Sequence, residues 1–281
     1  MTAGHDDERA AGTAPADAAG SGLGSAELAE LARARQTLDN PGLVAKLADA
    51  VGQPIEGLVR MLPASARAMV GDTVQKALHA ALAAALRTLP AAPRRASRNG
   101  LHQALVGATG AVGGFFGVSG LAMELPLSTT LMLRSIAEIA RSEGEDLEDT
   151  AAQLECLSVF ALGGRSESDD AAESAYFAVR AGLAKALAEA AEHLAARGLT
   201  ARGAPIVVRL VAQVAGRFEA AVAEKIALQS LPVVGSATGA AINLAFIRHF
   251  QAMAQAHFAV RRLERRHGSD AVREAWQQLG S

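Results

Sequence analysis

Two side chains that could bind an anion lie near the C-terminal end of the sequence. His257 and Arg261 are four residues apart in a run of helix-forming residues, so one helix face would carry both. Together they could hold a phosphate or a carboxylate, for example from a lipid. The commoner arrangement is a hydrogen-bonded core histidine beside an arginine paired with Glu264 or with a more distant glutamate. The spacing leaves both interpretations open.

A hydrolytic site is the catalytic alternative, and its candidate residues are Glu124, His249, His257 and Arg261. A zinc peptidase usually carries two histidines four residues apart around a glutamate, and the sequence has no such motif. His249 and His257 are eight residues apart, which on one helix is ~12 Å along the axis and too far to share an ion. We therefore expect no bound metal and no cofactor.

Other catalytic motifs are missing as well. Ser119 lies in Gly-Val-Ser-Gly, which lacks the spacing of a hydrolase nucleophile elbow. The glycine-rich stretch 107–114 has no following Lys-Ser or Lys-Thr pair that would bind phosphates. Cys156 is the single cysteine, which excludes an internal disulfide and favours a buried apolar role.

A second set of polar residues could line a binding surface within an apolar bundle. Arg134, Glu138 and Arg141 share one side of a predicted helix. They form either a solvated face or a polar seam, which would face Glu224 and Lys225 or the helix that carries the histidines and arginines. Asn243 precedes the histidines on the last long helix. The candidate residues for ligand or partner binding are Arg134, Glu138, Glu224, Lys225, Asn243, His257 and Arg261.

The elements that must position these residues are helices. Ala, Leu, Arg and Glu dominate the long periodic runs, and β-branched clusters that would indicate strands are missing. The sequence predicts an all-α fold, with one multi-helix domain over 25–276 and a disordered tail over 1–24, which has almost no apolar residues to bury. We expect helices at 25–38, 43–51, 64–89, 127–142, 150–161, 171–197 and 204–226, and a long C-terminal helix after 235.

Two glycine-containing segments without charged residues, 99–123 and 226–247, form the expected centre of the domain. Each exceeds the ~20 residues that a membrane-spanning helix needs. Their glycines and Pro232 disfavour a continuous helix, so we favour a tightly packed core over an embedded hairpin. In that core Gly114 and Gly239 would lie where helices approach closely.

Charge and targeting signals indicate where the protein acts. The formal net charge is −2, so no overall basic field attracts nucleic acid. The N-terminal residues are acidic and have no apolar core, unlike a signal peptide, so we expect a cytoplasmic protein. A local basic cluster of Arg94, Arg95 and Arg98, with an apolar edge near Phe115 and Phe116, could attach it peripherally to the inner face of a membrane.

Several long motifs occur in one order along the chain: KLADAVGQPIEGLV (46–59), GGFFGVSGLAMELPLSTTLMLRSIAEIARSEGEDL (113–147), LECLSVFALGG (154–164), AYFAVR (175–180), RFEAAVAEKIALQSLPVVGSATGAAIN (217–243) and HFQAMAQAHFAVRRLERRHG (249–268). In these motifs the chain resembles the EcsC family of bacterial proteins from residue 43 to about 275. The family is named after a member encoded beside two components of an ABC transporter, and some members are labelled peptidase or hydrolase.

The resemblance implies a non-enzymatic accessory or regulatory protein whose partners are a membrane surface or components of a membrane transporter. The alternative is a hydrolase-like enzyme with a polar site between the glycine-rich helices. The sequence does not indicate an oligomeric state.

Overall fold

The computed structural model describes residues 22–39, 42, 43, 47, 64–89, 103, 104, 106, 121–164, 175–198, 204–229 and 236–280. This part of the chain contains helices and no strands, which confirms the all-α prediction. The helices are α1 (Ser25–Asp39), α3 (Ala64–Thr88), α5 (Leu121–Ser142), α6 (Thr150–Leu162), α7 (Ala175–Arg197), α8 (Pro205–Gln229), α9 (Ser236–His267) and α10 (Ser269–Gln278). Residues 1–21 of the predicted tail 1–24, most of the predicted helix 43–51, and Arg94, Arg95 and Arg98 lie outside the described residues.

Local signals set several of the helix ends. The Asp149 side chain accepts a hydrogen bond from the backbone N–H of Ala151 and caps α6. Gly198, with φ +66°, follows α7, and Gly268, with φ +92°, separates α9 from α10. Glycine adopts this left-handed backbone conformation without the steric penalty that other residues incur, so the chain can turn sharply at both places.

Helix α5 begins six residues earlier than the predicted start at 127, and Pro126 lies inside it. The proline removes one backbone hydrogen bond, so the turn before it needs other support. Leu125 is fully buried, and the Glu124 carboxylate accepts hydrogen bonds from Lys225 and Asn243. Contacts with two other helices therefore hold a turn that the local sequence disfavours.

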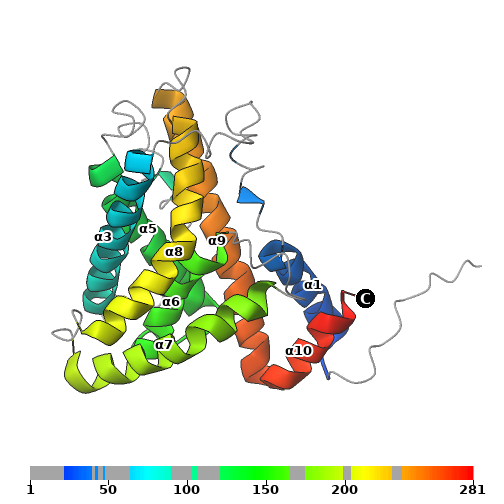
Figure 1. Ribbon diagram of the computed structural model, residues 1–281. Coiled ribbons are helices and arrows are strands. Elements are labelled where there is room, and N and C mark those ends of the chain that lie inside the picture. Colours follow the sequence, from blue (N-terminus) through cyan, green and yellow to red (C-terminus); the bar gives the residue numbers. More distant parts are fainter. Residues whose placement is uncertain are drawn as a thin grey trace, which may run out of the picture.

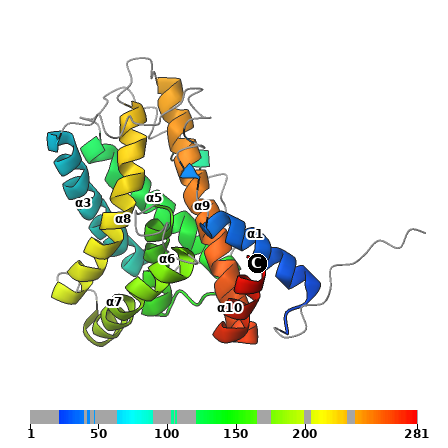
Figure 2. The same ribbon diagram turned by 45° about the vertical axis from the view of Figure 1, so that its right-hand side comes forward.

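Helix α9 is the longest element and runs through the molecule beside α1, α5, α6 and α10. Helix α3 packs against both α5 and α8 on one side of it, as Figures 1 and 2 show. Helix α7 lies across the lower part of α6 and α8 in Figure 1, while α1 and α10 lie on the opposite side of α9. With its 32 residues α9 spans about 48 Å, enough to reach every layer.

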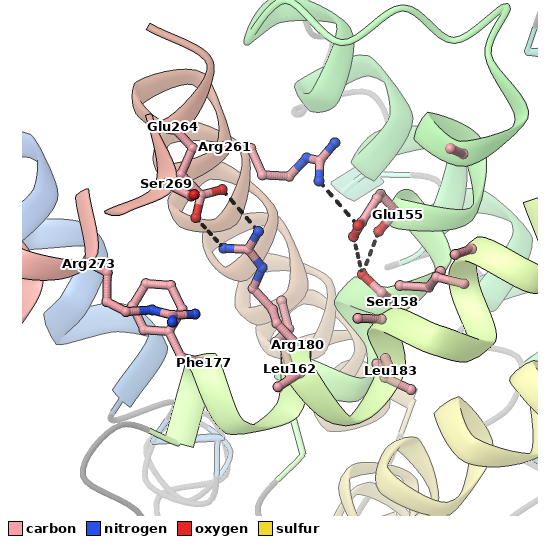
Figure 3. Close-up of a pocket in the computed structure, with 15 residues that line it drawn as sticks. Glu155, Ser158, Leu162, Phe177, Arg180, Leu183, Arg261, Glu264, Ser269 and Arg273 are labelled. Atoms are coloured by element: carbon pink, nitrogen blue, oxygen red, sulfur yellow. Dashed lines mark hydrogen bonds and ion pairs between the residues drawn. The ribbon is translucent and has the colours of Figure 1, made fainter. Parts of the chain in front are cut away.

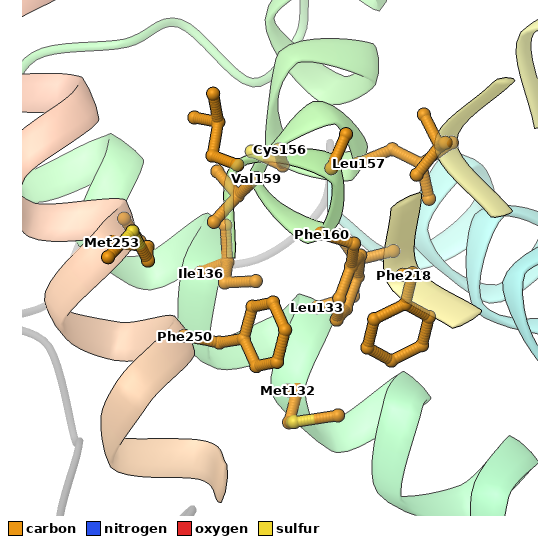
Figure 4. Close-up of a cluster of buried hydrophobic side chains, with 14 of the residues drawn as sticks. Met132, Leu133, Ile136, Cys156, Leu157, Val159, Phe160, Phe218, Phe250 and Met253 are labelled. Carbon is orange, nitrogen blue, oxygen red and sulfur yellow. The ribbon is translucent and has the colours of Figure 1, made fainter. Parts of the chain in front are cut away.

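The centre of the core is a cluster of phenylalanines where α5, α6, α8 and α9 meet (Figure 4). The ring centroids of Phe160 and Phe218 are 4.7 Å apart, and each lies 5.4 Å from that of Phe250. Cys156 is fully buried beside this cluster, and burial raises the pKa of its thiol. It is a core residue rather than a reactive cysteine.

One end of the bundle, which we name the upper end, collects parts of both uncharged segments. The first helical turns of α3, α5 and α9 and the last turn of α8 lie there, at the top of Figure 1. The segment 226–247 is divided between α8, which ends at Gln229, and α9, which begins at Ser236. Among the described helices, none combines the length and the apolar character needed to cross a bilayer. Gly239 is buried on α9, and Gly114 lies outside the described residues.

The glycine pair after α6 makes a close helix contact that the fold requires. A Cβ atom at Gly164 would collide with the backbone carbonyl oxygen of Arg217 on α8. We expect Gly164→Ala to lower the free energy of unfolding by about 1–3 kcal/mol, because backbone atoms have to move apart. Chemical denaturation of the purified variant measures this change.

Gly182 is the matched control, because a Cβ atom there meets nothing within 4 Å in the middle of α7. Gly182→Ala should raise the free energy of unfolding by about 0.5–1 kcal/mol through helix propensity alone. Equal stability of the two variants would mean that α6 and α8 do not touch at Gly164.

Candidate functional site

The sequence-predicted residues fall into separate groups along α9. Asn243 lies near its N-terminal end and His257 fourteen residues later, a separation of about 21 Å along the axis. Glu124 bonds to Asn243 and is therefore far from His257 and Arg261. The structure thus does not bring the four hydrolase candidates into one site.

The first group is a buried ion pair with an amide, which we call the upper triad: Glu124, Lys225 and Asn243. Lys225 Nζ donates to Glu124 Oε1 over 2.5 Å, and Asn243 Nδ2 donates to the same oxygen over 2.8 Å. All three residues are buried, and the Lys225 ammonium lies 5.3 Å from the centroid of the Phe246 ring. The triad links α5, α8 and α9 in a dry environment, where a charge without its partner is costly.

Other members of the predicted binding set lie apart from this triad. Arg134 is exposed, about 15 Å further along α5 than Glu124, and Glu138 is half-buried. Glu224 is half-buried as well, directly before the fully buried Lys225. The glutamate that faces Lys225 is therefore Glu124, in the turn before Pro126, and not Glu138 of the predicted polar seam.

The second group surrounds His257, and we call His257, Tyr176, Glu155 and Arg261 the histidine cluster. The Tyr176 hydroxyl lies 3.0 Å from His257 Nδ1, and His257 Nε2 faces Glu155 Oε2 at 3.5 Å. Arg261 donates to Glu155 Oε1 over 3.1 Å and to Glu145 over 2.8 Å. Of the two interpretations that the spacing left open, this arrangement corresponds to the core histidine beside an arginine paired with a distant glutamate, here Glu155.

The cluster continues into a pocket of about 460 Å³ bounded by α6, α7, α9 and α10 (Figure 3). Arg180 makes a two-pronged ion pair with Glu264, at 2.8 and 2.9 Å, and also donates to the Tyr176 hydroxyl over 3.3 Å. Ser158 lies beside Glu155 on α6. The remaining lining is mostly apolar, with leucines and alanines of α7 and α6.

Burial and charge set the protonation states in the cluster. Burial alone would raise the pKa of Glu155, but His257, Arg261 and Arg180 outweigh it and lower that pKa to about 2. Burial lowers the pKa of His257, which Glu155 offsets only in part, and burial raises the pKa of Tyr176. These pKa shifts favour a neutral His257 beside an ionised Glu155. In that state His257 Nδ1 accepts a hydrogen bond from the Tyr176 hydroxyl, and its Nε2 proton points towards Glu155.

The geometry does not match nucleophilic catalysis. The Ser158 hydroxyl donates to the Glu155 carbonyl over 2.7 Å and to its carboxylate over 3.1 Å, not to a histidine. A carboxylate with a pKa of about 2 is a weak general base at neutral pH. His249 Nε2 contacts the Gly163 carbonyl over 2.9 Å, at the end of α6. Within the described residues no three His, Cys, Asp or Glu side chains gather closely enough to bind a metal.

Sequence reasoning missed Glu155, Tyr176 and Arg180. The motifs 154–164 and 175–180, which carry the family resemblance, contain all three residues, and that was the available signal. Arg261 pairs with Glu145 and Glu155, whereas Glu264 pairs with Arg180. The partners come from α6, α7 and the loop before α6, which sequence spacing does not relate to α9.

Removing one charge of the upper triad should lower the free energy of unfolding. Removing both charges together should lower it by less than the sum of the two single substitutions. We expect Lys225→Met to lower the free energy of unfolding by about 3–5 kcal/mol, because Glu124 is left buried without its cation. Glu124→Gln combined with Lys225→Met should recover part of that loss. Chemical denaturation of the single and double variants tests the coupling.

The exposed pair Lys76 and Asp72, with side chains 72% and 65% exposed, is the control. Lys76→Met should change the free energy of unfolding by no more than about 1 kcal/mol. Strict additivity of the Glu124 and Lys225 substitutions would contradict a coupled pair.

The lowered pKa of Glu155 predicts an acid-dependent part of the stability. The pKa is about 2 in the folded chain against an ordinary value of 4.5, so the contribution is complete above pH 4.5 and is lost as the pH falls towards 2. It amounts to about 3 kcal/mol at neutral pH. Glu155→Gln should therefore be much less stable than the unchanged chain at pH 7, and nearly equal to it at pH 2.

Thermal unfolding monitored by circular dichroism across this pH range measures the difference between the two chains. Glu148→Gln, at an exposed position before α6, is the control and should follow the unchanged chain at every pH. A constant difference between Glu155→Gln and the unchanged chain would show that Glu155 is not held in its charged form.

Comparisons with known proteins agree with the arrangement of motifs. A model of the EcsC protein family matches residues 25–263, which is most of the chain. The match includes the upper triad and all four residues of the histidine cluster. Neither the curated proteins nor the solved structures contain a match. The chain belongs to the EcsC protein family.

Proposed function

We propose that this protein is a non-enzymatic accessory or regulatory protein of the cytoplasm that attaches peripherally to the inner face of a membrane or to a membrane transport complex. The observation that carries the proposal is that the polar candidates for catalysis are used in pairing with other residues of the fold. Glu124 binds Lys225 and Asn243, and Glu155 binds Arg261 and faces His257. Side chains held in this way serve to fix helices in place.

The same observation weakens the hydrolase alternative. An acyl-transfer site needs a nucleophile, a base in contact with it and donors for the oxyanion. In the described residues the Ser158 hydroxyl meets only a carboxylate and a carbonyl of Glu155. Cys156 is fully buried, and its pKa is raised.

The upper end of the bundle supports the choice of contact surface. The uncharged residues 107–120 connect Val106 to Leu121, and 230–235 connect Gln229 to Ser236. The Val106 carbonyl accepts from Asn243, so the connected ends all lie near the upper triad. The described residues that flank the two stretches therefore lie at one end of the molecule.

Two exposed apolar side chains lie at this end as well. Leu127 is 53% exposed and Met69 is 40% exposed, each within the first turns of a helix that begins at the upper end. Apolar side chains of this kind gain free energy when they enter the interfacial region of a bilayer. Arg94, Arg95 and Arg98 lie outside the described residues, and we propose them as the basic part of the mixed apolar and basic contact that peripheral proteins use.

Flotation with liposomes tests the membrane contact. We expect binding to vesicles that contain phosphatidylglycerol and little binding to phosphatidylcholine vesicles. Raising the salt from about 0.1 M to 1 M should release the protein, because the screening length falls from ~10 Å to ~3 Å. No binding at low salt would refute the membrane contact, and release by detergent alone would refute peripheral attachment.

Charge removal makes the test specific. Replacing Arg94, Arg95 and Arg98 together by Gln should weaken binding about a hundredfold, since each basic residue at an anionic surface contributes about 1 kcal/mol. The matched control replaces three exposed arginines on other helices, Arg33, Arg197 and Arg209, by Gln. Equal weakening by both triple variants would mean that only net charge matters and that the basic cluster is not the contact.

A further inference from the structure

We infer that the pocket beside the histidine cluster binds a single-chain anionic amphiphile, with a phosphate or carboxylate head and an alkyl tail. This inference does not depend on the proposed membrane contact. The pocket is lined by α6, α7, α10 and the C-terminal part of α9, which lie at the lower end of the bundle in Figure 1, away from the upper end. Its volume of about 460 Å³ is in the range of small-molecule sites.

The apolar part of the lining fits an alkyl tail. Leu162, Phe177, Leu183 and Leu187 line the pocket together with several alanines, and more of the exposed lining is apolar than polar. An alkyl chain that fills this space gains hydrophobic free energy from its own surface and from the surface of the lining. A free inorganic anion would leave this apolar surface exposed to water.

The charged part of the lining selects the head group. Three arginines and two glutamates line the pocket: Arg180, Arg261, Arg273, Glu155 and Glu264. Glu264 is occupied by Arg180 and Glu155 by Arg261, so neither carboxylate is free to repel a bound anion strongly. The arginine left over is Arg273.

Arg273 has no ion pair or hydrogen bond with the residues that the structure describes. Its guanidinium lies 5.2 Å from the centroid of the Phe177 ring, reaching from α10 to α7 on the Arg180 side of the pocket (Figure 3). Stacking on the ring orients the guanidinium and leaves its N–H groups available for a bidentate bond to phosphate or carboxylate. The Arg273 guanidinium is thus complementary to the charged head of one amphiphile, and the apolar lining is complementary to its tail.

The binding site has a built-in reporter. Trp276 is the single tryptophan of the chain and is buried. Its ring centroid lies 5.2 Å from that of Phe177, a lining residue, and 5.2 Å from that of Tyr176. A ligand that moves Phe177 should therefore change the fluorescence of Trp276.

Isothermal titration calorimetry tests the proposal, with Trp276 fluorescence as a second readout. The probes are octyl phosphate and octanoate, compared with inorganic phosphate for the head alone and octyl glucoside for a tail without charge, all below their micelle concentrations. We expect saturable binding of the two anionic amphiphiles, at least about ten-fold tighter than either comparison probe. No saturable heat with octyl phosphate or octanoate, or equal affinity for octyl glucoside, would overturn the proposal.

Three variants locate the binding. Arg273→Gln should weaken octyl phosphate binding about ten-fold or more and leave octyl glucoside unchanged. Lys185→Gln removes an exposed cation of α7 that does not line the pocket, and should have no effect. Ala184→Phe places a ring at an exposed lining position and should abolish binding while the melting temperature is kept. Unchanged affinity in either Arg273→Gln or Ala184→Phe would place the ligand elsewhere.

Vesicle flotation separates a soluble amphiphile from a bilayer lipid. Arg273→Gln should float with phosphatidylglycerol vesicles as well as the unchanged chain does, because the pocket takes single molecules from solution. Loss of flotation in this variant alone would assign the pocket to bilayer lipid and refute the soluble ligand.

Discussion

The fold depends on one constraint: the buried polar side chains of α9 need hydrogen-bond partners on other elements. Four polar residues of its described part are buried: Asn243, His249, Gln251 and His257. A polar group buried without a hydrogen bond costs about 1–3 kcal/mol, which is a large fraction of the stability of a domain. Each of the four finds at least one partner on another element: Glu124 for Asn243, the Gly163 carbonyl for His249, Ser135 for Gln251 and Tyr176 for His257. These bonds fix the positions of α5, α6 and α7 along the axis of α9.

Charge plays the same role at the C-terminal end of α9. Arginines are favoured there because the helix dipole is negative at that end. Arg262 pairs with Glu30 and Glu143, Arg265 with Glu145, and Arg266 with Glu27. These pairs connect α1 and the loop before α6 to one turn of α9. Because most of them are partly exposed, each contributes modestly, and their main effect is to position the elements.

The use of polar groups for positioning accounts for the charged residues that the described part of the molecule holds at its centre. A catalytic group needs a free face towards substrate, whereas Glu124 and Glu155 each accept bonds from two or more side chains. The apolar recess beside the histidine cluster and the arginine over Phe177 are different, because they carry binding capacity that the fold does not use. The proposed binding of an anionic amphiphile depends on this difference.

The sequence by itself determined the all-α class, most helix bounds and the family. Helix propensity and capping are local, so α1 and α6 could be predicted within one residue of their ends. It also placed His257 and Arg261 on one helix face, because residues four apart lie together on a helix, and left open whether they hold an external anion or pair within the chain. Only the tertiary structure decided that this anion is Glu155, and that Glu124 faces Lys225. Contacts between residues about one hundred positions apart depend on how helices pack, and no spacing along the chain encodes that directly.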